Sequence, residues 1–213
     1  MSGEFDEQAL IQAARQGDIQ AFNLLVERYQ DFLFRIAVRM LGDEDSAADA
    51  CQLAWISAFR NINGFRGDRL QTWLARVLVN ICYDEIRRRH RRHEVPLLPV
   101  NTDDEEIEAA SWLADPAPSV EQRVEMDEFE IVMQKCLQSL TPVYRTMLVL
   151  VDIEGLSYEE AAIAAAVPPG TVRSRLARAR MALRQSLQQS AGSIPAHYSL
   201  QLLPLKQTRL RVP

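Results

Sequence analysis

SYEEAAIAAAVPPGTVRSRLARARMALRQSL, residues 157–187, predicts two helices joined by a tight turn. Ser157 and Glu160 have the spacing of a capping box, in which each side chain bonds the backbone amide of the other residue. The alanines that follow favour helix. Residues 168–170, Pro-Pro-Gly, then end this first helix, because proline lacks the amide donor and glycine permits positive φ. We expect Thr171 to cap a second helix that runs to the end of the stretch.

The second helix is amphipathic and carries arginine on its polar side. At ~100° per residue, its apolar face, expected in a core, consists of Val172, Leu176, Ala179 and Leu183. The opposite face consists of Ser174, Ala177, Arg178 and Met181, with Arg173 nearby and with Arg175 and Arg180 on the two flanks. An apolar back, an arginine-bearing front and a short preceding turn are typical of a DNA recognition helix. A solvated basic face on an ordinary bundle helix is the alternative interpretation.

Composition favours a helical globular protein. The 213 residues are 47% hydrophobic and 25% charged, with only eight glycines. The N-terminus, MSGEFDEQAL, is acidic and lacks the apolar core of a signal peptide. No apolar run approaches the ~20 residues of a membrane span, so we expect a cytoplasmic protein without membrane insertion.

The charge of the chain is unevenly distributed. A net charge of −5 is unusual for a DNA-binding protein, but acids concentrate at 103–108 and 121–130, whereas bases concentrate at 87–92 and 173–184. Two basic segments separated by an acidic one predict two separate contacts with a polyanion. Strong nonspecific binding by the free protein is not expected.

Cysteine and histidine positions argue against metal and disulfide sites. Cys51, Cys82 and Cys136 lie far apart, without the C-x-x-C spacing of zinc sites or the even number of a disulfide framework. His90 and His93 lie three residues apart, but the arginines around them would repel a cation. We therefore expect no metal and no cofactor.

Apolar residues at steps of three and four predict a first helical domain over residues 1–92. It includes a long amphipathic helix over 19–41, which Asp18 is expected to cap and Gly42 to end. After a loop at 61–68, its last helix is expected to bury an apolar face and to expose a polar one that ends in the arginine cluster 87–92. That polar face consists of Thr72, Arg76, Asn80, Tyr83 and Arg87.

The remainder of the chain is predicted to form a linker, a second domain and a tail. Residues 93–118 contain four prolines and an acidic run, which predicts a flexible acidic linker. Periodicity returns at 119–190, where we expect four helices. Residues 191–213 have no clear period and carry no prediction. The predicted fold class is all-α, with two small helical domains.

Both domains carry motifs of a known family. They are Gly64-Phe65-Arg66-Gly67-Asp68, Thr72-Trp73-Leu74, Val79-Asn80, the stretch from Gly155 to Glu160, and the stretch from Pro169 to Arg175. In these motifs, their order and their spacing, the chain resembles bacterial RNA polymerase sigma factors of the sigma-70 family. It is most similar to the small extracytoplasmic-function (ECF) group.

The resemblance implies binding to core RNA polymerase, direction of the enzyme to promoters and help in opening the duplex. Minus-35 contacts are then expected from Thr171, Arg173, Ser174, Arg175, Ala177 and Arg178. Minus-10 contacts are expected from Phe65, Arg66, Gly67, Asp68, Arg76, Asn80, Arg87 and Arg88. Contacts with the β′ clamp are expected from Asp49, Gln52 and Leu53, where Leu53 replaces the usual acid of the family. The second domain is also expected to touch the β flap, and an anti-sigma factor to mask these surfaces.

Physical arguments fit these assignments. A loop can form a pocket for an unstacked base, and Asn80 offers both a donor and an acceptor to a base edge, although a solvated helix residue is the alternative for Asn80. The linker, at about 26 residues, reaches at most ~85 Å, enough for promoter elements ~70 Å apart.

Two other classes of protein remain as alternatives. A helix-turn-helix regulator with an N-terminal sensing domain would bind an operator without polymerase. A helical enzyme is disfavoured, because the sequence shows no paired carboxylates in a plausible pocket, no glycine-rich phosphate loop and no nucleophile with a base. We expect no catalytic activity.

Overall fold

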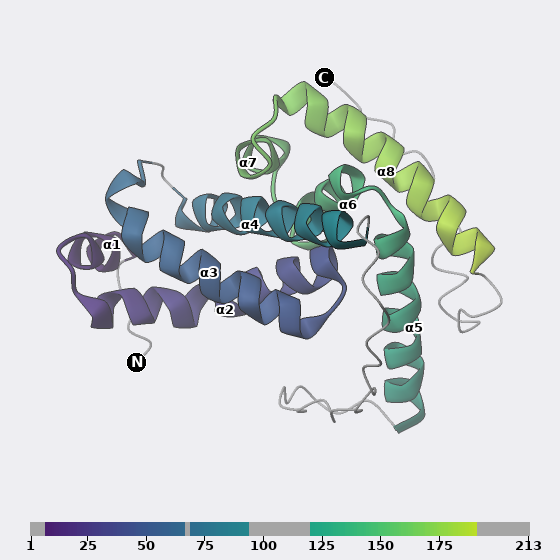
Figure 1. Ribbon diagram of the computed structural model, residues 1–213, viewed down its shortest axis with the longest axis horizontal. Helices are drawn as coiled ribbons and strands as arrows, with labels where there is room; N and C mark the ends of the chain where they lie inside the picture. Colours follow the sequence, from purple (N-terminus) through teal and green to yellow (C-terminus); the bar gives the residue numbers. More distant parts are fainter. Residues whose placement is uncertain (1–6, 67–68, 94–119, 191–213) are drawn as a thin grey trace, which may run out of the picture.

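The computed structural model describes residues 7–66, 69–93 and 120–190, and the regular structure of these segments is helical (Figure 1). The N-terminal half consists of α1 (Glu7–Arg15), α2 (Ile19–Leu41), α3 (Glu44–Asn61), the short η1 (Ile62–Gly64) and α4 (Leu70–His93). The C-terminal half consists of α5 (Val120–Ser139), α6 (Pro142–Met147), the π-helical turn η2 (Leu148–Ile153), α7 (Tyr158–Ala164) and α8 (Pro169–Gln189). The predicted linker and tail lie outside the described residues. None of the helices in these segments is long and apolar enough to cross a membrane.

Local sequence signals determine both ends of α2. Asp18 caps its N-terminus by accepting hydrogen bonds from two amides of the first turn, at 2.9 and 3.1 Å. Gly42 ends the helix in the left-handed region, at φ +92°, and its amide donates to the carbonyl of Val38. The expected helix over 19–41 is confirmed.

The helix pair at 157–187 is confirmed, but its turn differs from the prediction. Both bonds of the capping box are present, from Ser157 N to Glu160 Oε2 at 2.8 Å and from Glu160 N to Ser157 Oγ at 3.2 Å. Thr171 does not cap α8, because the helix already begins at Pro169. Proline is tolerated there because an amide at the first helical position has no acceptor within the helix. The positive φ of the turn falls on Ala166, at +53°, and not on the glycine.

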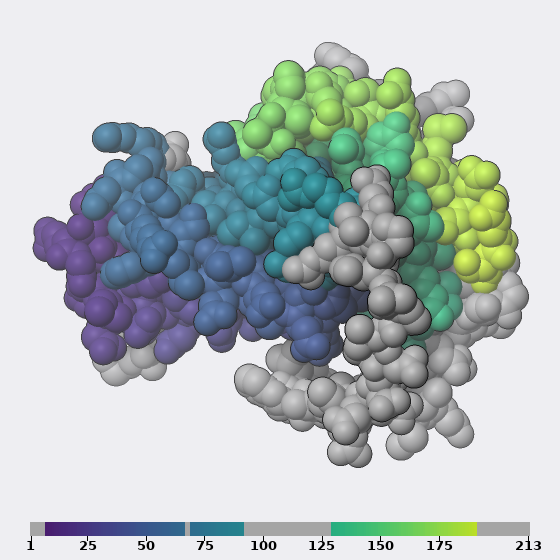
Figure 2. Space-filling view, in the orientation of Figure 1, coloured from purple at the N-terminus to yellow at the C-terminus, as the bar shows by residue number. Residues whose placement is uncertain are grey.

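The two halves pack against each other. Figure 1 shows α7 lying over α4 and α5 beside the C-terminal end of α2, and these pairs of helices are in contact. A continuous apolar cluster runs through both halves, from Ile11 in α1 to Ala179 in α8. In the space-filling view, the surface of α4 adjoins that of the C-terminal half without a gap (Figure 2).

The C-terminus of α2 is the main polar junction between the halves. Of its last four carbonyls, that of Val38 accepts the Gly42 amide, and the other three would be costly to bury unsatisfied. Each of the four accepts a hydrogen bond from the side chain of another helix. The pairs are Val38 O with Gln134 Nε2 (2.8 Å), Arg39 O with Gln138 Nε2 (3.1 Å), Met40 O with Arg145 Nη1, and Leu41 O with Arg89 Nη1 (3.2 Å).

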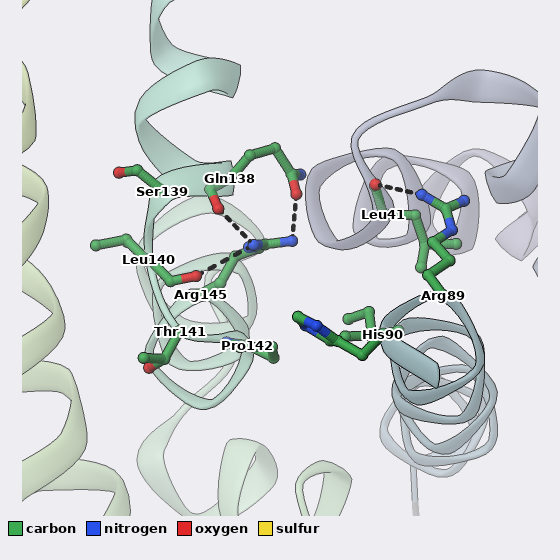
Figure 3. A pocket seen from close by; sticks show the side chains of 10 residues that line it. Leu41, Arg89, His90, Gln138, Ser139, Leu140, Thr141, Pro142 and Arg145 are labelled. Atoms are coloured by element: carbon green, nitrogen blue, oxygen red, sulfur yellow. Dashed lines mark hydrogen bonds between the residues drawn. The ribbon is translucent and has the colours of Figure 1, made fainter. Parts of the chain in front are cut away.

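Arg145 is the most buried donor at this junction, with 6% of the residue exposed. It also donates to carbonyls at the end of α5, at 2.9 Å to Leu137 O. Figure 3 shows two further bonds of this kind, at 2.8 Å to Gln138 O and 3.1 Å to Leu140 O. Burial lowers the pKa of this guanidinium. The carbonyls around Arg145 oppose this effect, because they lie at the negative ends of two helix dipoles, those of α2 and α5, and stabilise the cation.

Gly42 provides a test of the junction. A Cβ at Gly42 would lie 2.8 Å from Gln138 Cδ and would displace the side chain that bonds Arg39 O. We therefore expect Gly42→Ala to lower the free energy of unfolding by about 1–2 kcal/mol for the positive φ and by about 1 kcal/mol more for the lost bond.

Gly17→Ala is the matched control for this prediction. Gly17 has nearly the same φ, +91°, but nothing lies within 4 Å of its added Cβ. Chemical denaturation of both variants separates backbone strain from the contact between the halves. Equal losses would show that Gln138 contributes nothing to stability.

Candidate nucleic-acid interface

The front of α8 is open to solvent. Its apolar back is buried as expected, with Val172 and Ala179 at 0% exposure. The side chains expected at the front, Arg173, Ser174, Ala177 and Arg178, are all exposed. Within the described segments, neither arginine of that group forms an ion pair, so both are available to a polyanion.

Of the two flanking arginines of α8, Arg180 is engaged within the protein. Arg180 donates from Nε and Nη2 to the two carboxylate oxygens of Asp152, at 2.8 and 2.6 Å. This bidentate hydrogen bonding raises the pKa of Arg180. Arg175 is half-buried near Tyr83 of α4, where its charge opposes the rise in the tyrosine pKa that burial causes. The front of α8 is thus the exposed cationic surface, and Arg175 borders it as a half-buried side chain.

The loop before α4 combines buried and exposed side chains. Phe65 is 2% exposed, and its ring centroid lies 5.5 Å from that of Trp73. Its side chain therefore anchors the loop, and in this arrangement it does not face solvent. Arg66 is exposed. Gly67 and Asp68 lie outside the described residues.

The polar face of α4 is partly covered by the C-terminal half. Arg76 and Asn80 are exposed, as expected. Thr72 is not, because α7 packs over this part of α4 and leaves it 5% exposed. Tyr83 is half-buried and shares a hydrogen bond of 2.8 Å with Thr146. The edge of this face that contains Thr72 and Tyr83 is thus covered, and the edge that contains Arg76 and Asn80 is open to solvent.

Glu160 connects α7 to the start of α4. In addition to its role in the capping box, its carboxylate pairs with Arg69 at 2.5 Å and accepts a hydrogen bond from Thr72 at 3.5 Å. Burial alone would raise the pKa of Glu160, but the hydrogen bonds from Ser157 and Arg69 outweigh it, and the pKa lies below its ordinary value. An acid of the C-terminal half therefore neutralises an arginine next to the loop.

The arginine cluster at the end of α4 divides into two kinds of side chain. Arg87 and Arg88 are exposed and pair with acids of their own helix, Arg87 with Asp84 and Arg88 with Glu85 at 2.6 Å. Such exposed pairs are weak, so both arginines can exchange their partners for phosphate. Arg89 is half-buried and bonds the junction of α2 and α3, so it is structural rather than available to a ligand.

The outer face of α3 is polar at one end and apolar in the middle. Asp49 and Gln52 are exposed. Leu53 is 56% exposed and Ile56 is 42% exposed. Leu53 thus lies on the same open face as the two polar residues, as a surface for a partner requires.

No part of the described chain resembles a metal centre. The residues that the structure describes contain no cluster of three or more His, Cys, Asp or Glu side chains that could hold a metal ion. The three cysteines are buried and free, and burial raises the pKa of Cys51 to about 11.

A cavity of about 500 Å³ lies between the ends of α4 and α5 (Figure 3). The guanidinium groups at its wall, Arg89 and Arg145, already have hydrogen-bond partners.

Comparisons with known proteins identify the family. The model of Sigma-70 region 2 matches residues 25–92, and that of Sigma-70 region 4 matches residues 131–183. The chain belongs to the sigma-70 family, in its ECF group. Region 2 therefore contains most of α2, α3 and α4, whereas region 4 contains the helix pair α7–α8.

Curated relatives resemble this sigma factor along nearly their whole length. The RNA polymerase sigma-H factor of Pseudomonas aeruginosa is 37% identical over 183 residues, which cover 85% of this chain and 94% of that protein. The ECF RNA polymerase sigma-E factor of Escherichia coli is 34% identical over 193 residues, covering 88% and 97%.

Solved structures share the fold of this sigma factor. The sigma factor RpoE of Bartonella quintana, in complex with the anti-sigma factor NepR, has a TM-score of 0.59 and 25% identity, covering 80% of this chain and 98% of that one. CnrH, in complex with the cytosolic domain of CnrY, has a TM-score of 0.59 at 24% identity, covering 86% and 97%.

The pair between Glu160 and Arg69 gives a testable prediction. Glu160→Gln retains an oxygen for the capping box but loses the charge that holds Arg69. Since the Arg69 side chain is 71% exposed, we expect a loss of only about 0.2–1 kcal/mol in the free energy of unfolding. Arg69→Met should cost a similar amount, and the double variant little more. Glu159→Gln, an exposed neighbour, is the control. Fully additive losses would contradict the pair.

The contribution of the pair between Glu160 and Arg69 to stability should depend on pH. Because the pKa of Glu160 is lowered from 4.5, its stabilisation is present above about pH 4.5 and is lost as pH falls through the lowered value. The stability difference between the wild type and Glu160→Gln should therefore narrow in acid. Denaturation at neutral pH and well below pH 4.5 measures this difference, and a gap that stays constant would contradict the assignment.

Proposed function

We propose that this sigma factor binds core RNA polymerase, directs it to specific promoters and supports initiation, acting in the cytoplasm and catalysing no reaction itself. The exposed arginine-bearing front of α8, with its apolar back buried, is the observation that carries the proposal. Such a helix can enter the major groove, where Arg173 and Arg178 can donate to base edges. Thr171, Ser174, Arg175 and Ala177 complete the proposed minus-35 surface.

We assign the minus-10 contacts to the loop and to the open edge of α4. Exposed Arg66, Arg76 and Asn80 support this assignment, and Arg87 and Arg88 extend it toward phosphates. Phe65 supports the loop from within the core, and Gly67 and Asp68 complete the proposed set. The proposed surface for the β′ clamp is the outer face of α3 with Asp49, Gln52 and Leu53, and the C-terminal half is proposed to touch the β flap.

An anti-sigma factor is the proposed regulatory partner. The solved relative from Bartonella quintana is bound to such a protein. In the present chain, the apolar middle of the α3 face gives a binding protein a surface to cover, with Leu53 and Ile56 exposed.

Transcription with purified components tests the proposal. We expect core polymerase to yield discrete promoter-specific start sites from a genomic promoter pool only when this chain is added. A gel shift of the chain alone on the same DNA is the control, because specific binding without polymerase would favour an operator-binding regulator. Identical transcripts with and without the chain would overturn the proposal.

Arg178→Ala tests the recognition helix. We expect it to cost about 1–3 kcal/mol at particular bases of the minus-35 element and to relax preference there, as measured by transcription from single-base promoter variants. Arg180→Ala is the matched control, since that arginine bonds Asp152 and lies outside the front. A uniform loss across all sequences would demote Arg178 to a phosphate contact.

A further inference from the structure

Arg15, the last residue of α1, reaches across to the segment that leads into α4. Its Nη2 donates to the carbonyl of Phe65 at 2.5 Å, and its Nε donates to the carbonyl of Ile62 at 3.5 Å. A guanidinium is a rigid planar fork, so a single side chain fixes the relative positions of two backbone oxygens.

The same two residues anchor this segment from the other side. Ile62 is 3% exposed and Phe65 is 2% exposed, and the amide of Phe65 donates to Ile62 O at 3.2 Å. The side chains of this segment are thus held in the core and its carbonyls are held by Arg15. The exposed Arg66 follows directly after this doubly anchored residue, Phe65.

Charge pairing does not explain the placement of Arg15. In the described segments, its hydrogen bonds go only to these neutral carbonyls, and it takes part in no ion pair. Ring packing between Phe65 and Trp73 already supplies the apolar stabilisation of the loop. The contribution of Arg15 is therefore geometric.

We propose that Arg15 is a positioning residue for base recognition at the minus-10 element, acting through the backbone at Phe65 and the exposed Arg66 that follows it. The inference rests on the proposed function. It extends the recognition apparatus to α1, which precedes the matched region 2 at residues 25–92.

Promoter pairs that differ at one minus-10 base test this inference, with core polymerase and the full chain. Arg15→Met should reduce the ratio of transcripts within such pairs by about tenfold, the value of one charge-assisted hydrogen bond, while preference at the minus-35 element is retained. Arg15→Lys keeps the charge but not the fork, so it should lower the same ratio, by less. Arg28→Met, which removes an exposed arginine that contacts Glu7 of α1, should leave the ratio unchanged.

The outcomes are distinguishable. If the ratio is unchanged in Arg15→Met, or if all promoters lose activity equally, the inference is overturned and Arg15 is only structural. If Arg15→Met does not fold, Arg15→Lys decides, and full discrimination by that variant overturns the inference. If the wild type itself shows promoter-specific starts but no minus-10 preference, the proposed role of Arg15 is overturned and the proposed function stands. If it yields no specific starts, the proposed function fails with it.

Discussion

The satisfaction of the α2 carbonyls is the constraint on which the arrangement of this protein depends. A helix C-terminus that is buried between two halves needs donors, and the C-terminal half supplies them from Gln134, Gln138 and Arg145. Arg145 in turn needs those carbonyls, because a buried guanidinium without acceptors would be strongly destabilising. Each half therefore completes the polar groups of the other, and apolar packing closes around them.

The closed arrangement has unequal consequences for the two proposed DNA-contacting surfaces. It leaves the front of α8, the proposed minus-35 surface, exposed. It covers Thr72 and occupies Arg69 with Glu160, so the start of α4 is partly blocked. Separation of α7 from α4 would release these groups. The capping box of α7 needs only Ser157 and Glu160, and would survive that separation.

Sequence periodicity predicted the individual helices better than their association. The limits of α2 followed from apolar spacing, Asp18 and Gly42, all of which are local signals. The prediction that Thr171 caps α8 is wrong, because the helix begins two residues earlier, at Pro169. Its N-cap residue, Pro168, forms no side-chain capping bond. The family motifs identified the candidate DNA-binding residues. The sequence does not predict that Gln138 and Arg145 bond the carbonyls of α2. A polar residue that caps a distant helix has the same sequence pattern as a solvated one.

A distance measurement between the two halves tests whether the free chain is closed. Spin labels on the exposed Arg60 of α3 and Gln185 of α8 report on this distance, and the three native cysteines are buried. We expect one narrow distance distribution for the free protein, matching the structure, and a longer distance in the complex with core polymerase and promoter DNA. A broad distribution in the free protein, such as a long unrestrained linker gives, would contradict it.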